Sequence, residues 1–201
     1  MIVFVRHGQT AVNRAGQLQG RVDTDLTALG RQQAGAVAGA LAALPVARVV
    51  SSPLRRASAT AEAIGDVLGL RVERDDRLVE LDYGEWDQRL IRDIAREEWD
   101  AWRTDPKWAP PGGETLLEVT ERIAQFCDAQ LGEDLVVAVS HVSPIKAAVC
   151  LALGVDERAT WKMHLDLASI TRIARRAAGP LFLASYNETA HLDASTRLNL
   201  H

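Results

Sequence analysis

A short apolar segment that ends in three functional residues is the feature that most constrains this chain. Ile2 to Val5 are apolar and mostly β-branched, which predicts a buried strand, and Arg6, His7 and Gly8 follow directly. In an α/β protein such a strand delivers polar residues to the carboxyl edge of its sheet, where ligands bind. Gly8 permits a sharp turn and a close backbone approach. The segment therefore predicts a binding site at the end of the first strand.

The groups at this strand end suit a tetrahedral oxyanion such as phosphate. Arg6 offers a planar set of donors, exposed backbone N–H groups add others, and the amide of Asn13 follows within reach. A basic residue and a histidine in a solvated loop would give the same pattern, and three residues alone do not decide between the two interpretations. The rest of the chain has to supply the context.

Composition limits the classes of protein that this chain can belong to. Its 201 residues are 47% apolar and 25% charged, which is typical of one soluble globular domain, here expected to span residues 1–201. The formal net charge of −4 gives no reason to expect nucleic acid or an anionic membrane as a partner. An anion site must then be a local concentration of positive charge. A homodimer stays open.

Cysteine usage and hydropathy indicate a cytoplasmic protein. Cys127 and Cys150 lie in segments of helical composition without a CxxC neighbour, so we expect both to be reduced core residues. Met1 leads directly into the first strand, and no apolar stretch is long enough to span a bilayer.

Strands and helices alternate along the rest of the chain. This alternation predicts an α/β fold, a single domain with a mostly parallel sheet and helices on both faces. Thr27 and Ser52 are expected to cap the first two long helices, with Pro53 at the first helical position of the second. The tail after Asn187 is expected to be loose. The predicted strands are residues 2–5, 46–50, 70–73, 135–139, 168–173 and 181–186; the predicted helices are 28–43, 53–69, 89–103, 114–131, 144–153 and 156–162; and 78–86 and 104–113 are irregular.

Four separate places along the chain carry residues suited to phosphate chemistry. They are Arg6-His7, Arg55-Arg56, Glu80 and His141, each near a strand end or a helix start. The carboxyl ends of parallel strands lie along one edge of the sheet, so these groups can converge although they are far apart in sequence.

The motifs around these residues resemble those of the histidine phosphatase superfamily, whose fold is phosphoglycerate-mutase-like. The resemblance runs from Ile2 to about Ile173, and residues 140–146 have a weaker similarity to the α-ribazole phosphatase-like members. The motifs occur in the expected order and are Arg6-His7-Gly8-Gln9-Thr10, residues 26–34, Ser51-Ser52-Pro53-Leu54-Arg55-Arg56-Ala57, residues 80–86, Pro111-Gly112-Gly113-Glu114-Thr115 and Val139-Ser140-His141.

The resemblance implies a role for each matching residue. His7 is the nucleophile that becomes phosphorylated, and Glu80 is the general acid and base. Arg6, Arg56 and His141 hold the phosphoryl oxygens. Four further residues contribute to substrate binding: Asn13 through its amide, Gly8 through close backbone approach, Glu114 at the rim and Val142 through its backbone N–H. Arg55 is expected to be a surface charge.

Elementary chemistry agrees with these roles. A neutral imidazole attacks phosphorus only if one ring nitrogen is free and the other is held as N–H. The transferring group spreads negative charge over its oxygens, which fixed cations stabilise. Two arginines and a protonated His141 are expected to supply that charge without a metal or any other cofactor. Glu80 protonates the leaving alcohol and later deprotonates water.

Two features of the sequence bear on the substrate. Many family members have glycine and arginine where this chain has Val142 and Lys146. The tryptophans at 86, 99, 102 and 108 form either an aromatic wall of the pocket or, as we expect, part of the core; Trp99 and Trp102 share one helix face. His164 is expected to be a packing residue, and an approach to the pocket is the alternative.

The sequence therefore predicts a phosphomonoester hydrolase that acts on a small phosphorylated metabolite. A mutase-type phosphotransferase and a catalytically silent phosphate-binding regulator are the alternatives. A mutase has to exclude water from its phosphohistidine, and residues 105–113 are too short and irregular to seal a pocket. A silent regulator has no use for Glu80. Both considerations favour hydrolysis.

Overall fold

Six strands form one sheet in the computed structural model, which describes residues 1–130, 132, 134–176, 179–193 and 196. The strand order is β3-β2-β4-β1-β5-β6; the first three pairings are parallel, and the two made by β5 are antiparallel. The predicted α/β fold with a mostly parallel sheet is confirmed. The strands are β1 (Ile2–Arg6), β2 (Val46–Ser51), β3 (Val72–Arg74), β4 (Leu135–Ser140), β5 (Ile170–Arg175) and β6 (Leu181–Glu188).

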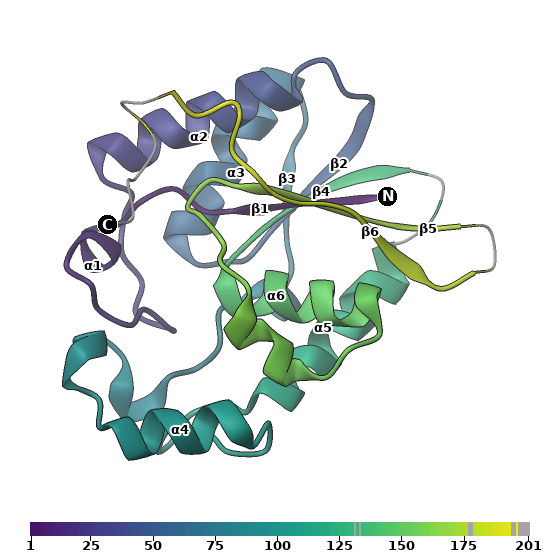
Figure 1. Ribbon diagram of the computed structural model, residues 1–201. Helices are drawn as coiled ribbons and strands as arrows, with labels where there is room; N and C mark the ends of the chain where they lie inside the picture. Colours follow the sequence, from purple (N-terminus) through teal and green to yellow (C-terminus); the bar gives the residue numbers. More distant parts are fainter. Residues whose placement is uncertain (131, 133, 177–178, 194–195, 197–201) are drawn as a thin grey trace.

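Alternation along β1 explains why the sheet is covered on both faces. Val3 and Val5 belong to one buried cluster with residues of α2 and α3, whereas Ile2 and Phe4 belong to another with residues of α5 and α6. Figure 1 shows these helix pairs on opposite faces of the sheet, with α4 farther out on the side of α5 and α6. The helices are α1 (Ala11–Arg14), α2 (Ala28–Leu41), α3 (Arg55–Leu68), α4 (Arg96–Thr104), α5 (Leu116–Gln130) and α6 (Val142–Leu153); four short 3₁₀ helices are η1 (Asp76–Leu78), η2 (Gly84–Trp86), η3 (Ile91–Asp93) and η4 (Glu157–Lys162).

The backbone of Gly8 closely approaches the start of α2, as the sequence predicts. The Thr27 side chain caps α2 by accepting from the Gly30 N–H at 3.0 Å. A Cβ on Gly8 would lie 2.3 Å from the Gly30 carbonyl oxygen. The backbone after β1 therefore packs directly against the first turn of α2, and Gly8 is needed for that contact.

Two predicted helix starts, those of α3 and α4, are wrong. Helix α3 begins at Arg55 after Leu54, so neither Ser52 nor Pro53 has its predicted place in the helix start. Helix α4 begins at Arg96 and not at Arg89. The carbonyl of Arg89 accepts from the Leu18 N–H at 2.9 Å, so this segment pairs with a distant loop and cannot be helical there.

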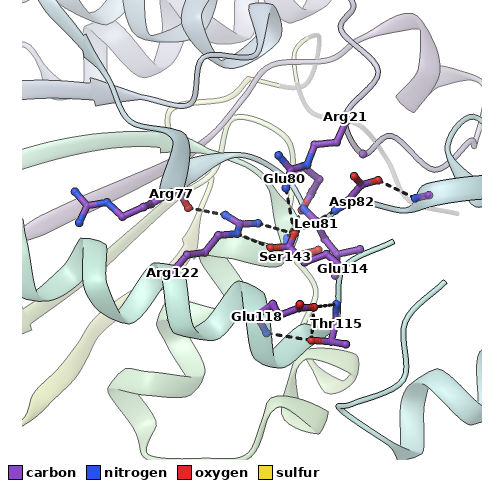
Figure 2. Close-up of polar contacts among 12 residues, drawn as sticks. Arg21, Arg77, Glu80, Leu81, Asp82, Glu114, Thr115, Glu118, Arg122 and Ser143 are labelled. Carbon is purple, nitrogen blue, oxygen red and sulfur yellow. Dashed lines mark hydrogen bonds and ion pairs between the residues drawn. The ribbon is translucent and has the colours of Figure 1, made fainter. Parts of the chain in front are cut away.

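Two other helix starts shift by two residues. Helix α5 begins at Leu116 because Thr115 and Glu118 cap it reciprocally, with the Glu118 N–H donating to the Thr115 hydroxyl at 3.1 Å (Figure 2). Helix α6 begins at Val142, before Pro144, because proline in the first turn loses no intrahelical hydrogen bond. Strands β3 and β5 begin two residues later than predicted.

The segment after Asn187 is more ordered than the sequence predicts. Strand β6 extends to Glu188, Leu192 is buried, and the Thr196 carbonyl accepts from Gln33 Nε2 at 2.8 Å. The expectation of a loose tail is therefore wrong for residues 188–193; His201 lies outside the described residues. Cys127 and Cys150 are unpaired and buried, as predicted. Within the described ranges, no helix has the length and apolarity that crossing a membrane requires.

Candidate active site

Five of the predicted site residues lie together at the carboxyl edge of the sheet: Arg6, His7, Arg56, Glu80 and His141. His7 follows β1 and His141 follows the neighbouring β4, and their ring centroids are 5.0 Å apart. Glu80 reaches the same edge because the Ser140 hydroxyl donates to the Leu78 carbonyl at 2.7 Å and holds that loop. A cleft of about 390 Å³ opens beside them; its lining includes Arg6, His7, Asn13, Gln19, Glu80 and Val142.

Hydrogen bonding fixes the tautomer of His7. Its Nδ1 lies 2.7 Å from the Gly8 carbonyl oxygen, which can only accept, so Nδ1 carries the hydrogen and Nε2 is left with its lone pair. Burial, and then the charges of Arg56 and Arg6, lower the pKa of His7 well below its usual value. A neutral imidazole with a free Nε2 is the form that a nucleophile requires.

Arg6 presents an unpaired donor. One terminal nitrogen donates to the Leu165 carbonyl at 2.6 Å, while the buried Nε has no hydrogen-bond partner among the described residues. Burial lowers the pKa of Arg6 to about 10, so the guanidinium is still charged at neutral pH. Arg6 therefore brings a positive charge to the lining of the cleft, where it can stabilise an oxyanion.

Arg56 is fully buried and held by the protein through all of its nitrogens. The two terminal nitrogens donate to the carbonyls of Gly20 and Val22 at 2.7 and 2.8 Å, and Nε donates to His141 Nδ1 at 3.2 Å. Its neighbour Arg55 is exposed and pairs with Asp25, as expected for a surface charge. The guanidinium of Arg56 therefore places a fixed positive charge next to His141.

His141 is neutral in the structure, contrary to the expectation of a protonated His141. Its Nδ1 accepts from Arg56, so Nε2 carries the hydrogen and donates to the Ser52 hydroxyl at 2.8 Å. Burial and then the charge of Arg56 lower the pKa of His141 well below its usual value. Sequence reasoning missed Ser52 as this partner; the available signal was that Ser52 closely follows a predicted strand, as His7 and His141 also do.

Glu80 lies at the N-terminus of α6. Its two carboxylate oxygens accept from the backbone N–H groups of Leu81, Val142 and Ser143 at 2.8, 3.0 and 3.1 Å. Figure 2 shows Glu80 beside Leu81 and Ser143. The N–H groups of a helix N-terminus are suited to a carboxylate. Val142 lines the cleft, but its N–H is directed to Glu80 and not to a ligand.

Three predicted binding residues occupy different places. Asn13 lines the cleft and caps α1, where its Oδ1 accepts from the Thr10 N–H at 3.1 Å. The Gly8 N–H donates to the Thr60 hydroxyl at 3.1 Å. Glu114 is not part of the cleft lining; it pairs with Arg122 at 2.8 Å and accepts from the Asp82 N–H at 3.2 Å, which fixes the loop after Glu80 (Figure 2).

The aromatic residues and His164 complete the surroundings. Trp86 and Trp102 are buried in the core cluster, and Trp99 and Trp108 pack against it, in agreement with the expected core role. Trp99 and Trp102 also line a smaller pocket beside the cleft. The expectation that His164 is a packing residue is wrong, because its side chain is 55% exposed and lines the cleft, with Nε2 3.0 Å from Asp166 Oδ1.

Comparison with known proteins agrees with this arrangement. Residues 2–188 match the model of the histidine phosphatase superfamily (branch 1). The chain belongs to this family. Among the residues that the structure describes, no three or more histidine, cysteine or acidic side chains lie close enough together to hold a metal ion.

Individual family members resemble the chain over most of its length. It is 36% identical over 198 residues to a bifunctional protein of Mycobacterium tuberculosis, covering 95% of this chain but only 54% of that protein. It is 33% identical to phosphoserine phosphatase 1 of Hydrogenobacter thermophilus, covering 95% of this chain and 93% of the relative. The histidine phosphatase fold of this chain matches the structure of a mycobacterial glucosyl-3-phosphoglycerate phosphatase in complex with VO₃, with a TM-score of 0.84, 34% identity and 94% and 98% of the two chains covered.

Proposed function

We propose that this protein is a metal-independent phosphomonoester hydrolase that works through a phosphohistidine on His7. The observation that carries the proposal is the free Nε2 of a neutral, buried His7 in a cleft that the charged side chain of Arg6 also lines. A nucleophile and a cation that line one cleft suit attack on a phosphoryl group.

The reaction divides into two steps. His7 Nε2 attacks phosphorus, the bond to the alcohol oxygen breaks, and Glu80 gives its proton to the leaving alkoxide. Water then attacks the phosphohistidine, the P–N bond breaks, and Glu80 takes the proton from that water. Arg6 and Arg56 stabilise the charge that develops on the phosphoryl oxygens in both steps.

The substrate that we propose is a small phosphorylated metabolite, and its acceptor is water. Relatives of this chain are named for phosphoserine and for glucosyl-3-phosphoglycerate, both phosphomonoesters. A probable phosphoglycerate mutase is also 34% identical, which keeps the phosphotransferase as the second candidate. The cleft that leads to Glu80 admits water, which favours hydrolysis over return of the phosphoryl group to a sugar acid. Free, buried Cys127 and Cys150 are compatible with the cytoplasm.

Detection of the phosphorylated enzyme tests the proposal. Brief mixing with ³²P-labelled phosphomonoester and quenching in acid or base is expected to leave a label that is lost in acid and survives in base. The His7→Ala variant should lose both label and turnover, and the wild-type protein should keep its activity after dialysis against a chelator. Turnover of His7→Ala at the wild-type rate would refute the proposed nucleophile, and phosphoglycerate isomerisation that outruns phosphate release would favour the mutase.

A further inference from the structure

A loop at residues 18–22 holds the guanidinium of Arg56. The carbonyl oxygens of Gly20 and Val22 accept from the two terminal nitrogens of Arg56 at 2.7 and 2.8 Å. Because Arg56 is fully buried, it depends on these two carbonyls both for its place and for the pairing of its donors. A residue that positions this loop therefore also positions Arg56.

The carboxylate of Asp87 binds the N–H groups of the same two loop residues. Its Oδ1 accepts from the Gly20 N–H and its Oδ2 accepts from the Val22 N–H, both at 2.9 Å. A carboxylate that accepts from two N–H groups of one loop fixes the orientation of that loop as well as its position. Gly20 and Val22 therefore connect Asp87 to Arg56, since each of them donates to the carboxylate and accepts from the guanidinium.

Backbone pairing brings Asp87 to this loop. The Leu18 carbonyl accepts from the Gln88 N–H at 2.9 Å, and the Leu18 N–H donates to the Arg89 carbonyl at the same distance. Gln88 has a φ of 67°, a strained conformation that persists only where the surrounding contacts hold it. The segment that carries Asp87 is therefore firmly held against residues 18–22.

The negative charge of Asp87 also acts on Arg56. Burial lowers the pKa of Arg56, and nearby carboxylates oppose that effect, Glu80 most strongly and Asp87 among the others. Asp87 is half-buried and forms no ion pair with another residue that the structure describes, so its charge is not neutralised by a closer partner. Charge and hydrogen bonding thus act in the same direction, and both keep the guanidinium in its place.

The position of Arg56 decides the tautomer of His141. Arg56 Nε donates to His141 Nδ1 at 3.2 Å, so the ring hydrogen lies on Nε2, which donates to the Ser52 hydroxyl. If Arg56 moved away, Nδ1 would lose its donor, and the hydrogen could lie on either ring nitrogen. A change in the loop at residues 18–22 should therefore be measurable at His141.

We propose that Asp87 is a positioning residue of the active site, which holds residues 20–22 and through them the guanidinium of Arg56. Asp87 is not among the residues that line the cleft, so it acts through Arg56 and not on the substrate. This inference rests on the proposed function, in which Arg56 stabilises the transferring phosphoryl group.

A double-mutant cycle tests the kinetic part of the inference. Asp87→Asn keeps the shape of the side chain, but it removes the charge and replaces one of the two acceptors by a donor. It should lower kcat/KM for p-nitrophenyl phosphate about tenfold, mainly through kcat, because the charge of the transition state would meet a displaced cation. In an Arg56→Ala background the same substitution should have no further effect. The control Glu85→Gln changes an exposed carboxylate of the same segment and should leave the rate unchanged.

NMR of the His141 ring tests the inference without turnover. Long-range ¹H–¹⁵N correlation spectra report which ring nitrogen carries the hydrogen, and the signals of His141 are identified by their loss in His141→Asn. In the wild-type protein and in Glu85→Gln the hydrogen should lie on Nε2 alone. In Asp87→Asn it should be divided between the two ring nitrogens.

The outcomes separate the inference from the proposed function. A wild-type His141 spectrum or a wild-type rate in Asp87→Asn would overturn the inference, and so would losses at Asp87 and Arg56 that multiply in the double variant. If no phosphomonoester is hydrolysed, the proposed function has failed, and the His141 spectrum alone decides whether Asp87 positions Arg56. If a variant does not fold, Asp87→Ala or Arg56→Met takes its place with the same expected results.

Discussion

At the scale of individual residues, single hydrogen bonds decide which ring nitrogen of each histidine carries the hydrogen. The Gly8 carbonyl leaves His7 Nε2 free, and the Arg56 guanidinium directs the hydrogen of His141 toward Ser52. Both rings are neutral for the same physical reason, burial next to cations. Fixed positive charge therefore comes from the arginines, whose charge does not depend on pH in the physiological range.

Neighbouring arginines should differ sharply in their contribution to catalysis. Arg56→Ala removes a buried cation and should lower kcat/KM roughly a hundredfold or more. The negative charge on the transferring phosphoryl group would lose a stabilising cation, and His141 would lose its hydrogen-bond donor. Arg55→Ala removes an exposed ion pair and should change the rate little. Steady-state kinetics with p-nitrophenyl phosphate provides the comparison, after far-UV circular dichroism has shown that both variants fold. Similar losses at both positions would contradict this assignment.

At the scale of secondary-structure elements, the site depends on how closely α2 and α6 approach the sheet edge. The first turn of α6 supplies two of the N–H groups that hold Glu80. The first turn of α2 lies against the loop after β1, where both Gly8 and Gly30 lack the space for a Cβ. A shift of either helix would move Glu80 or His7, so the site depends on this backbone packing.

Two glycines of α2 provide a matched test of this packing. A Cβ on Gly30 would lie 2.1 Å from the Gln9 carbonyl oxygen, so Gly30→Ala should lower the free energy of unfolding by about 2–3 kcal/mol. Gly35 has open space around it in the same helix, so Gly35→Ala should raise the free energy by about 0.5–1 kcal/mol through helix propensity. Urea unfolding measures both, and a destabilised Gly35→Ala or a neutral Gly30→Ala would be inconsistent with the packing described.

For the whole molecule, the buried neutral histidines link folding to pH. His7 and His141 have pKa values well below 6.5 in the folded state, whereas in the unfolded chain they titrate near 6.5. Below pH 6.5 the unfolded state therefore binds more protons than the folded state, and stability falls as the pH falls. Above pH 6.5 neither state protonates these rings, and this contribution disappears.

The expected loss is about 1.4 kcal/mol per pH unit for each of the two histidines between pH 6.5 and their folded-state pKa values. Urea unfolding in phosphate-free buffer at pH 7, 6 and 5 measures it. Carboxylates with lowered pKa values, such as Asp75 and Asp166, contribute mainly below pH 4, outside this window. His7→Gln should halve the slope. A free energy of unfolding that stays constant from pH 7 to 5 would show that the rings titrate normally in the folded protein.

Local sequence determined the central strand, the order of the elements and the family to which the chain belongs. The apolar run before Arg6 specifies β1, and the order of the motifs places His7, Glu80 and His141 in one family pattern, because periodicity and motif order are properties of the linear chain. Helix starts that rest on a nearby cap, such as Thr27, were predictable for the same reason.

Only the tertiary structure decided which distant groups meet. The neutral state of His141 follows from Arg56 and Ser52, and the late start of α4 follows from pairing of Arg89 with Leu18. The smaller pocket beside the cleft likewise combines side chains from α4, α5, α6 and η4. These features depend on hydrogen bonds and burial between segments separated by tens of residues, and no local periodicity carries that information.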